Sequence, residues 1–284
     1  MVSQPGFVSD ESLTDPHRPG VSVLTPVHRP EPAFLDELHR SLDAQHGVDW
    51  EWLIQVDGGR SLARRIPASI RADPRVALEA NGRWFGQAVT RNLALVRAQH
   101  PLLQNVDADD LLLPGALAAG AAALRAEPDL GLVFGRTYDL SPDGSVAPGK
   151  NLYEPGRIEP GALYRDWERR GGSCSISVAS VMWRTACVDA AGGWPASIAG
   201  LDVLLLLAVN TLHPARCLDV DTYLYRLHPQ QVHRSALRFE MRPRYRELAR
   251  RMVAARTRLG MSAVPLDEPR SVVEAPGEGA TLAP

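Results

Sequence analysis

The chain has 284 residues, a mass of 30.9 kDa and 45% hydrophobic residues, which is the composition of an ordinary globular protein with a sizeable core. Its 31 basic and 33 acidic side chains give a formal net charge of −2, so no net positive field favours nucleic acid as a partner. Three cysteines argue against a disulfide framework and against a cysteine-based zinc site, and they indicate a reducing, cytoplasmic environment.

Residues 1–19 are mostly polar and contain no apolar segment of the kind found in a secretory signal, and residues 261–284 are rich in Pro, Glu, Gly and Ala. We expect both stretches to be disordered tails, because they cannot bury enough apolar area to offset their ordering entropy. The most apolar run, 201–209, contains Asp202 and is much shorter than a bilayer span. We expect a buried helix there, and no membrane span.

Short apolar runs alternate with helical patterns in the first half of the chain. This predicts strands at 21–24, 52–56, 76–78 and 102–106 and helices at 34–42 and 87–99. Strands that alternate with helices of this length imply right-handed crossovers and a mainly parallel sheet, so the predicted fold class is α/β. Such sheets bind ligands at the carboxyl ends of their strands.

The second half is less regular. Strands are predicted at 131–134, 175–183 and 217–225, and helices at 115–126 and 242–258. Residues 142–172 are rich in Gly and Pro and indicate loops rather than helices or strands.

The acidic triplet Asp107, Asp109 and Asp110 directly follows an apolar strand. Carboxylates two residues apart at the end of a strand can point into one cleft, where a hard divalent cation accepts oxygen ligands and keeps positions open for substrate phosphates. The alternative is a solvated acidic turn that caps the next helix. These residues alone leave both interpretations open.

Asp57 ends an earlier strand and is followed by Gly58 and Gly59, so backbone can approach a ligand there without a Cβ in the way. A carboxylate at this point can accept a hydrogen bond from a nucleobase edge, whereas a purely structural Asp-Gly turn is the alternative. Three strand ends, at Pro26, Asp57 and Asp107, thus present loop residues of the kind that hold a nucleotide.

Together these motifs resemble glycosyltransferase family 2, the inverting nucleotide-sugar transferases of the GT-A fold, over residues 21–237. The matching residues are Val21, Ser22, Val23, Leu24, Thr25 and Pro26, Asp57 with Gly58, Asn81 with Gly82, Arg91 with Asn92, and Asp107, Ala108, Asp109 and Asp110. The resemblance implies a GT-A fold with a Rossmann-like nucleotide-binding sheet. It also implies a nucleotide-sugar-binding half at 20–135, followed at 136–260 by an acceptor-binding half that includes the C-terminal helix.

The resemblance further implies roles for single residues. Asp57 would hydrogen-bond the nucleobase, in a pocket lined by Pro26 and Val27. Asp107 would contact the ribose or donor sugar and belong to the metal site, and Asp109 would bind Mg²⁺ or Mn²⁺ bridging the diphosphate. The other implied donor contacts are Thr25, Asn81, Arg83 and Ala108.

Two histidines, His228 and His233, follow the last predicted strand. A histidine at such a position is commonly a hydrogen-bonded loop residue. Some GT-A enzymes place a C-terminal histidine on the metal or near the diphosphate, and this resemblance makes His228 the candidate metal ligand. Which of the two histidines touches the metal or the diphosphate stays open.

Gly193 and Trp194 resemble the turn that precedes the family's catalytic acidic pair, which places Asp202 at the position of the catalytic base. The same resemblance makes Gly193 and Trp194 candidate acceptor contacts. Leu201 stands where the family usually has Glu. On its own, Asp202 either caps an apolar helix or lies in a cleft, where a carboxylate can take the proton of an acceptor hydroxyl.

The expected function is metal-dependent, inverting transfer of a sugar from a nucleoside diphosphate of UDP, GDP or dTDP to a hydroxyl or amine of a small-molecule acceptor. A nucleotidyltransferase is one alternative, although no Gly-rich phosphate loop with Lys or Arg follows the first strand. A catalytically inactive nucleotide-sugar-binding protein is the other, because of Leu201. The high Ala and Arg content is typical of a GC-rich genome, and enzymes of this kind in such genomes often modify secondary metabolites. A homodimer is left open.

Overall fold

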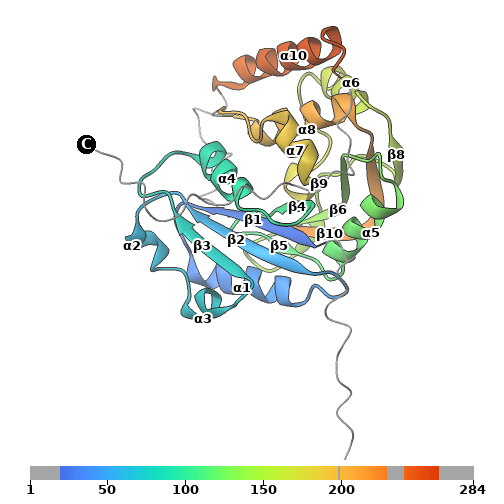
Figure 1. The fold of residues 1–284 in the computed structure, drawn as a ribbon. Coiled ribbons are helices and arrows are strands. Elements are labelled where there is room, and N and C mark those ends of the chain that lie inside the picture. Colours follow the sequence, from blue (N-terminus) through green and yellow to red (C-terminus); the bar gives the residue numbers. More distant parts are fainter. Residues whose placement is uncertain (1–19, 198, 229–239, 262–284) are drawn as a thin grey trace, which may run out of the picture.

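A computed structural model describes residues 20–197, 199–228 and 240–261 (Figure 1). The helices in these ranges are α1 (Pro32–Asp43), α2 (Arg60–Ala63), α3 (Ala68–Ala72), α4 (Gln87–Val96), α5 (Ala116–Ala126), α6 (Ala162–Arg169), α7 (Thr185–Ala191), α8 (Leu201–Leu212) and α10 (Arg242–Arg258), with a 3₁₀ turn at Val178–Ser180. The strands are β1 (Val21–Val27), β2 (Trp50–Val56), β3 (Val76–Ala80), β4 (Leu102–Asn105), β5 (Leu111–Leu112), β6 (Leu132–Leu140), β7 (Val146–Pro148), β8 (Gly156–Ile158), β9 (Met182–Arg184) and β10 (Ala215–Arg226). Residues 1–19, His233 and residues 262–284, which include nearly all of the expected tails, lie outside the described residues.

The described strands form one sheet with the order β3-β2-β1-β4-β9-β6-β10-β5. Strands β3, β2, β1 and β4 are parallel, β9 runs antiparallel to both β4 and β6, and β6 and β10 are parallel again. The α/β class with a Rossmann-like sheet is therefore confirmed. Because β6 and β10 join the same sheet as β1 to β4, the two expected halves of the chain share one scaffold.

Alternating side chains along β1 explain why helices cover both faces of the sheet. Val23 belongs to a core shared with Leu35 and Leu38 of α1, and Leu24 belongs to a second core shared with Leu95 of α4. Figure 1 shows α1 and α4 on opposite sides of the sheet. Each of these leucine side chains contributes about 1.5–3 kcal/mol to the free energy of folding when it is fully buried. The rigid sheet therefore fixes where its strand ends lie.

Residues 142–172 are more ordered than the sequence analysis predicts, because they contain β7, β8 and α6. Helix α6 buries Leu163 and Trp167, which are four residues apart and lie on one face. Charged residues surround this pair, so the apolar pattern that would predict a helix is limited to two positions. The strand expected at 175–183 is also wrong in part, since a 3₁₀ turn precedes β9.

The apolar stretch around Asp202 is the buried helix α8, as expected. At 12 residues it is too short to cross a bilayer, and no other helix in the described ranges combines the required length and hydropathy. The three cysteines are free thiols. Burial raises the pKa of the Cys187 thiol to about 12, so this cysteine is an inert core residue rather than a nucleophile.

Candidate active site

A cleft of about 1390 Å³ opens where β1 and β4 end at their carboxyl ends. Pro26 comes from the end of β1, Asp107, Ala108 and Asp109 come from the loop after β4, and Asp202 comes from the first turn of α8. The crossover helices place these strand ends at the same edge of the sheet, which is where a doubly wound sheet binds ligands.

His228 contacts the acidic loop in the lining of this cleft. Nε2 of His228 lies 2.7 Å from Oδ2 of Asp109, although the two residues are 119 positions apart in the chain. The side chains of Asp107 and Asp109 are 31% and 32% exposed, so both carboxylates are open to the cleft. Burial and the neighbouring charge of Asp107 raise the pKa of Asp109.

Asp110, the third member of the triplet, points away from the cleft and is fully buried. Its carboxylate accepts hydrogen bonds from the hydroxyl of Tyr223 at 2.9 Å and from the backbone N–H of Arg226 at 2.8 Å. Burial raises its pKa well above the ordinary value. Asp110 thus ties the acidic loop to β10. The capping interpretation of the triplet is wrong, because α5 begins only at Ala116, after Gly115.

Arg91 of α4 connects the acidic loop to the predicted base. Its Nη2 donates to Oδ1 of Asp107 at 2.7 Å and its Nη1 donates to Oδ1 of Asp202 at 2.8 Å. Only 2% of the Arg91 side chain is exposed. Burial opposes the charge of this guanidinium, but the charges of Asp202 and Asp107 outweigh it and raise the pKa of Arg91. The guanidinium of Arg91 therefore bridges Asp202 and the acidic loop.

Trp194 lies behind Asp202 rather than in the cleft. Its Nε1 donates to Oδ1 of Asp202 at 2.9 Å, and only 2% of the residue is exposed. Its backbone N–H donates to Oδ1 of Asn92 at 2.8 Å, next to Gly193, where a Cβ would lie 2.4 Å from the same oxygen. Gly193 therefore allows the turn to approach α4, and acceptor contact by Gly193 and Trp194 stays a prediction.

Asp202 is oriented by these contacts and does not serve as a helix cap. Oδ1 accepts from Arg91 and Trp194, and within the described residues Oδ2 forms no hydrogen bond. With 34% of its side chain exposed, this second oxygen is available to the cleft.

Asp57 makes a different set of contacts from the one expected. Oδ1 accepts from the backbone N–H of Phe85 at 2.6 Å and from Nδ2 of Asn81 at 3.1 Å, and Oδ2 accepts from the N–H of Gly86 at 2.9 Å. The residue is 3% exposed and does not line the cleft. In this structure Asp57 holds the loop before α4, and Asn81 also donates to Thr90. Nucleobase contact by Asp57 and donor contact by Asn81 stay predictions.

The remaining expected donor contacts divide between the cleft and the core. Pro26 and Ala108 line the cleft. Thr25 and Val27 are buried, and the hydroxyl of Thr25 accepts from Nε1 of Trp52 at 2.8 Å, so the structure places both away from the cleft. Arg83 lies in the exposed loop before α4 with its guanidinium 5.0 Å from the ring centre of Phe85, also outside the cleft lining.

Three residues of the site were not selected from the sequence. Arg91 matches the family, but the sequence assigns it no role in the site, and it predicts no site role for Asp139 or Lys150. Asp139 and Lys150 line the cleft on the side of β6 and the loop after β7. No local motif marks them, because only the packing of β6 beside β10 brings them to the cleft.

The donor set of the acidic loop fits a hard divalent cation. Carboxylate oxygens from Asp107 and Asp109 are the ligands that Mg²⁺ and Mn²⁺ prefer, and the imidazole of His228 adjoins them. Burial, and then the charge of Asp107, raise the pKa of Asp109, and a cation bound there would favour its charged form. Cation binding by Asp107, Asp109 and His228 stays a prediction.

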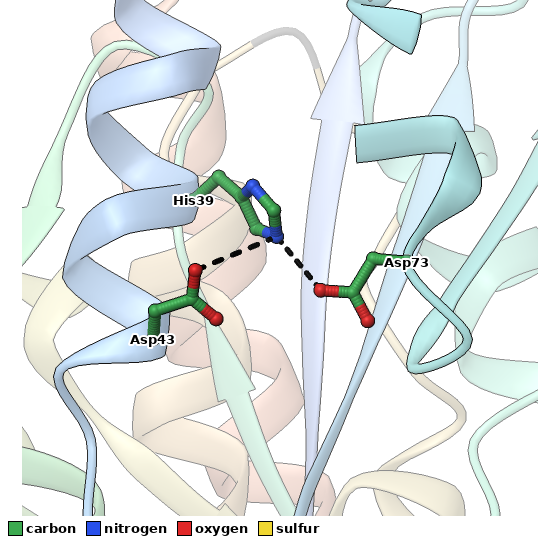
Figure 2. A group of neighbouring side chains, drawn as sticks. All are labelled: His39, Asp43 and Asp73. Carbon is green, nitrogen blue, oxygen red and sulfur yellow. Dashed lines mark hydrogen bonds and ion pairs between the residues drawn. The ribbon is translucent and has the colours of Figure 1, made fainter. Parts of the chain in front are cut away.

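A second group with a histidine and two carboxylates lies outside the cleft, where His39 and Asp43 of α1 face Asp73 (Figure 2). Nε2 of His39 lies 2.8 Å from Oδ2 of Asp73 and 4.0 Å from Oδ2 of Asp43. Arg75 Nη2 contacts both carboxylates, at 2.5 Å and 2.7 Å. Hydrogen bonds from Arg75, then from His39, lower the pKa of Asp73 against the opposing effect of burial. Arg75 already supplies the positive charge, so this group is an ion-pair network that ties α1 to the chain before β3.

The fold is that of GT-A glycosyltransferases. The crystal structure of TarS residues 1–349 from S. aureus, in complex with UDP-GlcNAc, superposes with a TM-score of 0.61 at 20% identity and covers 76% of this chain and 61% of that one. The structure of the same TarS fragment with UDP gives a TM-score of 0.60 at 18% identity, covering 83% and 64%. This chain thus spans less than two thirds of these TarS chains.

The sequence comparisons define the family. A family model described as glycosyl transferase family 2 matches residues 22–187, which is more than half of the chain, so the chain belongs to that family. The O-antigen biosynthesis protein RfbC of Myxococcus xanthus is 32% identical over 119 residues, which is 41% of this chain but 9% of RfbC. The resemblance drawn from the acidic loop and the strand ends is therefore confirmed.

Proposed function

We propose that this protein is a metal-dependent, inverting glycosyltransferase that moves a sugar from a nucleoside diphosphate to a hydroxyl or amine of a small-molecule acceptor. The observation that carries this proposal is the single cleft in which Arg91 joins Asp107 to Asp202, with Asp109 and His228 adjoining. This arrangement brings a cation site and a base within reach of one substrate.

Similarity to known proteins supports the choice of donor. The TarS structure that shares this fold holds UDP-GlcNAc, and RfbC is named for O-antigen biosynthesis. We infer a UDP-sugar donor, bound with its diphosphate toward the acidic loop. The acceptor would enter over Asp139 and Lys150, in the half of the chain assigned to acceptor binding, and secondary metabolites are one class of such acceptors. The free cysteines support a reducing compartment such as the cytoplasm.

A Mg²⁺ or Mn²⁺ ion held by Asp107, Asp109 and His228 would neutralise the diphosphate leaving group. The chain's own residues then have two tasks. Asp107 and Asp109 would hold the cation at the diphosphate end of the donor, and Asp202 would receive a proton on Oδ2. The acceptor oxygen forms a bond to C1 of the sugar as the bond from C1 to the diphosphate oxygen breaks, and the acceptor proton passes to Asp202.

Arg91 and Trp194 position the base in this scheme. Both donate to Oδ1 of Asp202, which leaves Oδ2 as the proton acceptor and fixes its direction. Because Arg91 also holds Asp107, the base and the donor site are kept in one geometry. This rigid spacing supplies the orientation that in-line attack needs.

The test is a donor panel with a product assay. UDP-, GDP- and dTDP-sugars are incubated with the protein and Mn²⁺, and release of the nucleoside diphosphate is followed with and without candidate acceptors. The proposal predicts slow donor hydrolysis that requires the metal and is lost in Asp202→Asn. Release of pyrophosphate from a nucleoside triphosphate would instead identify a nucleotidyltransferase, and donor binding without any release would identify an inactive binding protein.

A further inference from the structure

An apolar stripe runs from the loop between β3 and α4 along the outer side of α4. It consists of Trp84, Phe85, Val89, Leu93 and Val96, which are exposed by 68%, 40%, 39%, 40% and 82%. Within α4, Val89, Leu93 and Val96 are spaced four and three residues apart, so they lie on one face of the helix, and Trp84 and Phe85 lie in the loop before it. We call them the α4 stripe. Exposed apolar side chains that gather in this way indicate a surface that meets a partner.

Arginines flank the α4 stripe without nearby acids in the same segments. Residues 58–72 and 81–106 contain no Asp or Glu. Arg60, Arg64 and Arg65 come from the first segment and are exposed, and none of the three forms an ion pair within the described part of the chain.

The two segments are neighbours in space. A Cβ on Gly59 would lie 3.4 Å from the carbonyl oxygen of Gly82, so α2 begins beside the loop that carries Trp84. In Figure 1, α2 and the start of α4 lie toward the same side of the molecule. Arg83 belongs to this loop and is exposed next to Phe85. The start of α2, where Arg60 lies, therefore borders the loop that carries Trp84.

We propose that the α4 stripe and its flanking arginines dock on the surface of an anionic lipid bilayer. Trp and Phe side chains insert favourably at the level of the lipid head groups, and aliphatic side chains on the same helix face extend the buried area. Arginines around such a face are attracted to anionic lipids, each by an amount that corresponds to about a fivefold gain in binding. The chain needs no membrane-spanning helix for this attachment.

Charge and size favour a bilayer over a second copy of the chain. A two-fold symmetric dimer through the α4 stripe would place the same surface against itself, and the arginines of both copies would face each other. The stripe is also narrow, with five large side chains, whereas a stable protein interface commonly buries about 800 Å² on each partner. A bilayer requires only shallow insertion and an opposite charge.

The geometry also relates the docking surface to the cleft. Arg65 and Gln87, at the edges of the docking surface, both line the cleft. A chain docked through the α4 stripe would therefore open its cleft beside the bilayer. This proposal does not rest on the proposed transferase activity, and its test uses no substrate.

Trp84 provides a selective optical probe. The other five tryptophans, Trp50, Trp52, Trp167, Trp183 and Trp194, are at most 8% exposed, whereas Trp84 is 68% exposed. The full chain is titrated with vesicles of equal parts phosphatidylglycerol and phosphatidylcholine, and tryptophan emission is followed together with co-sedimentation. We expect a blue shift and pelleting with these vesicles, weakened by salt, and much weaker binding to vesicles of phosphatidylcholine alone.

Variants separate the apolar and the charged contribution. Trp84→Ser with Phe85→Ser should abolish pelleting, and Arg60→Gln with Arg64→Gln should weaken binding about 20-fold or more. Val146→Ser is the matched control, because Val146 is 55% exposed on β7 and lies outside the α4 stripe. Its binding should equal that of the unaltered chain. A thermal melt of each variant checks that the fold is retained.

Several outcomes would overturn the proposal. One is the absence of pelleting with anionic vesicles, and another is equal binding to vesicles of phosphatidylcholine alone. If the difference emission spectrum between the unaltered chain and Trp84→Ser were already blue before any vesicle is added, another part of the chain would cover Trp84. Concentration-dependent self-association in light scattering that Trp84→Ser removes would assign the α4 stripe to a second copy.

Discussion

Two groups in this molecule combine carboxylates, a histidine and an arginine, but their charges balance differently. In the network of His39, Asp43 and Asp73, Arg75 contacts both carboxylates and the pKa of Asp73 is lowered. In the cleft, the pKa of Asp109 is raised by burial and by its acidic neighbour. In the first group Arg75 contacts both carboxylates beside the histidine, whereas in the second Arg91 contacts Asp107 and Asp202, and within the described residues no arginine contacts the Asp109 carboxylate. The possible ligand atoms of His39, Asp43 and Asp73 lie within 4.8 Å of one another, but Arg75 already contacts both carboxylates, so we favour the acidic loop as the cation site.

The largest effect is expected from Asp202→Asn. The amide keeps the size of the side chain but cannot take a proton, so turnover should fall by about 10²–10⁴-fold. Donor binding should be nearly unchanged, because the substitution leaves the acidic loop intact. Turnover is measured as nucleoside diphosphate release, and binding by calorimetry.

Asp43→Asn is the matched control for Asp202→Asn. Asp43 also pairs with an arginine, but it lies in the network outside the cleft. Its substitution should leave turnover within about twofold, since exposed ion pairs contribute at most about 1 kcal/mol to stability and this one does not touch substrate. Equal losses in both variants would contradict the assignment of the base.

Arg91→Met tests the link between the two sides of the cleft. It leaves Asp107 and Asp202 facing each other without the buried cation between them, so the free energy of unfolding should fall by about 3 kcal/mol. We place the loss at the lower end of the range for buried pairs because both carboxylates are about one-third exposed. The measurement is urea denaturation.

Arg75→Met removes an arginine that also bridges two carboxylates, but from an exposed position with 42% of its side chain accessible. This substitution should lower the free energy of unfolding by at most about 1 kcal/mol. If both arginine variants lost the same free energy, the cleft arginine would be no more deeply embedded than the surface one.

Asp109→Asn tests where the cation binds. In the unaltered protein, Mn²⁺ with a donor nucleotide at about 100 times its dissociation constant should add about 2.7 kcal/mol of stability, or about 5 °C in the melting temperature. This gain should disappear in Asp109→Asn, and Asp73→Asn should keep it. A Mn²⁺-dependent gain lost in Asp73→Asn but kept in Asp109→Asn would place the metal in the network of α1.

The sequence predicted those parts of the site that depend on local pattern. Asp107 and Asp109 follow an apolar strand, and parallel strand order brings strand ends together, so their place in a cleft could be foreseen. The resemblance to the family brought in Asp202 and His228. These four residues do share one cleft.

Other features depend on contacts between distant segments, and no local pattern reports them. Arg91 reaches Asp202 across 111 positions, so its role follows only from the docking of α4 against α8. The hydrogen bonds that Asp57 accepts from the backbone N–H groups of Phe85 and Gly86 likewise depend on how the loop before α4 folds, and no local pattern indicates them. Helix α6 was missed because Gly and Pro surround it in the sequence and its apolar face consists of two residues.

The smallest effect concerns the acid stability of the network around Asp73. The pKa of Asp73 is lowered in the folded state by Arg75 and His39, whereas an unfolded Asp titrates near about 3.9. The contribution of this carboxylate is therefore fully present above about pH 5 and is lost as the pH falls through the lowered folded pKa. Asp73→Asn should reduce the free energy of unfolding by about 1 kcal/mol at neutral pH, and the difference from the unaltered chain should shrink below about pH 4. Urea denaturation of both proteins across this pH range measures it. A difference that stayed constant down to about pH 2 would mean that hydrogen-bond geometry, rather than charge, is what Asp73 supplies, and the contrast between the two carboxylate groups would then lose its electrostatic basis.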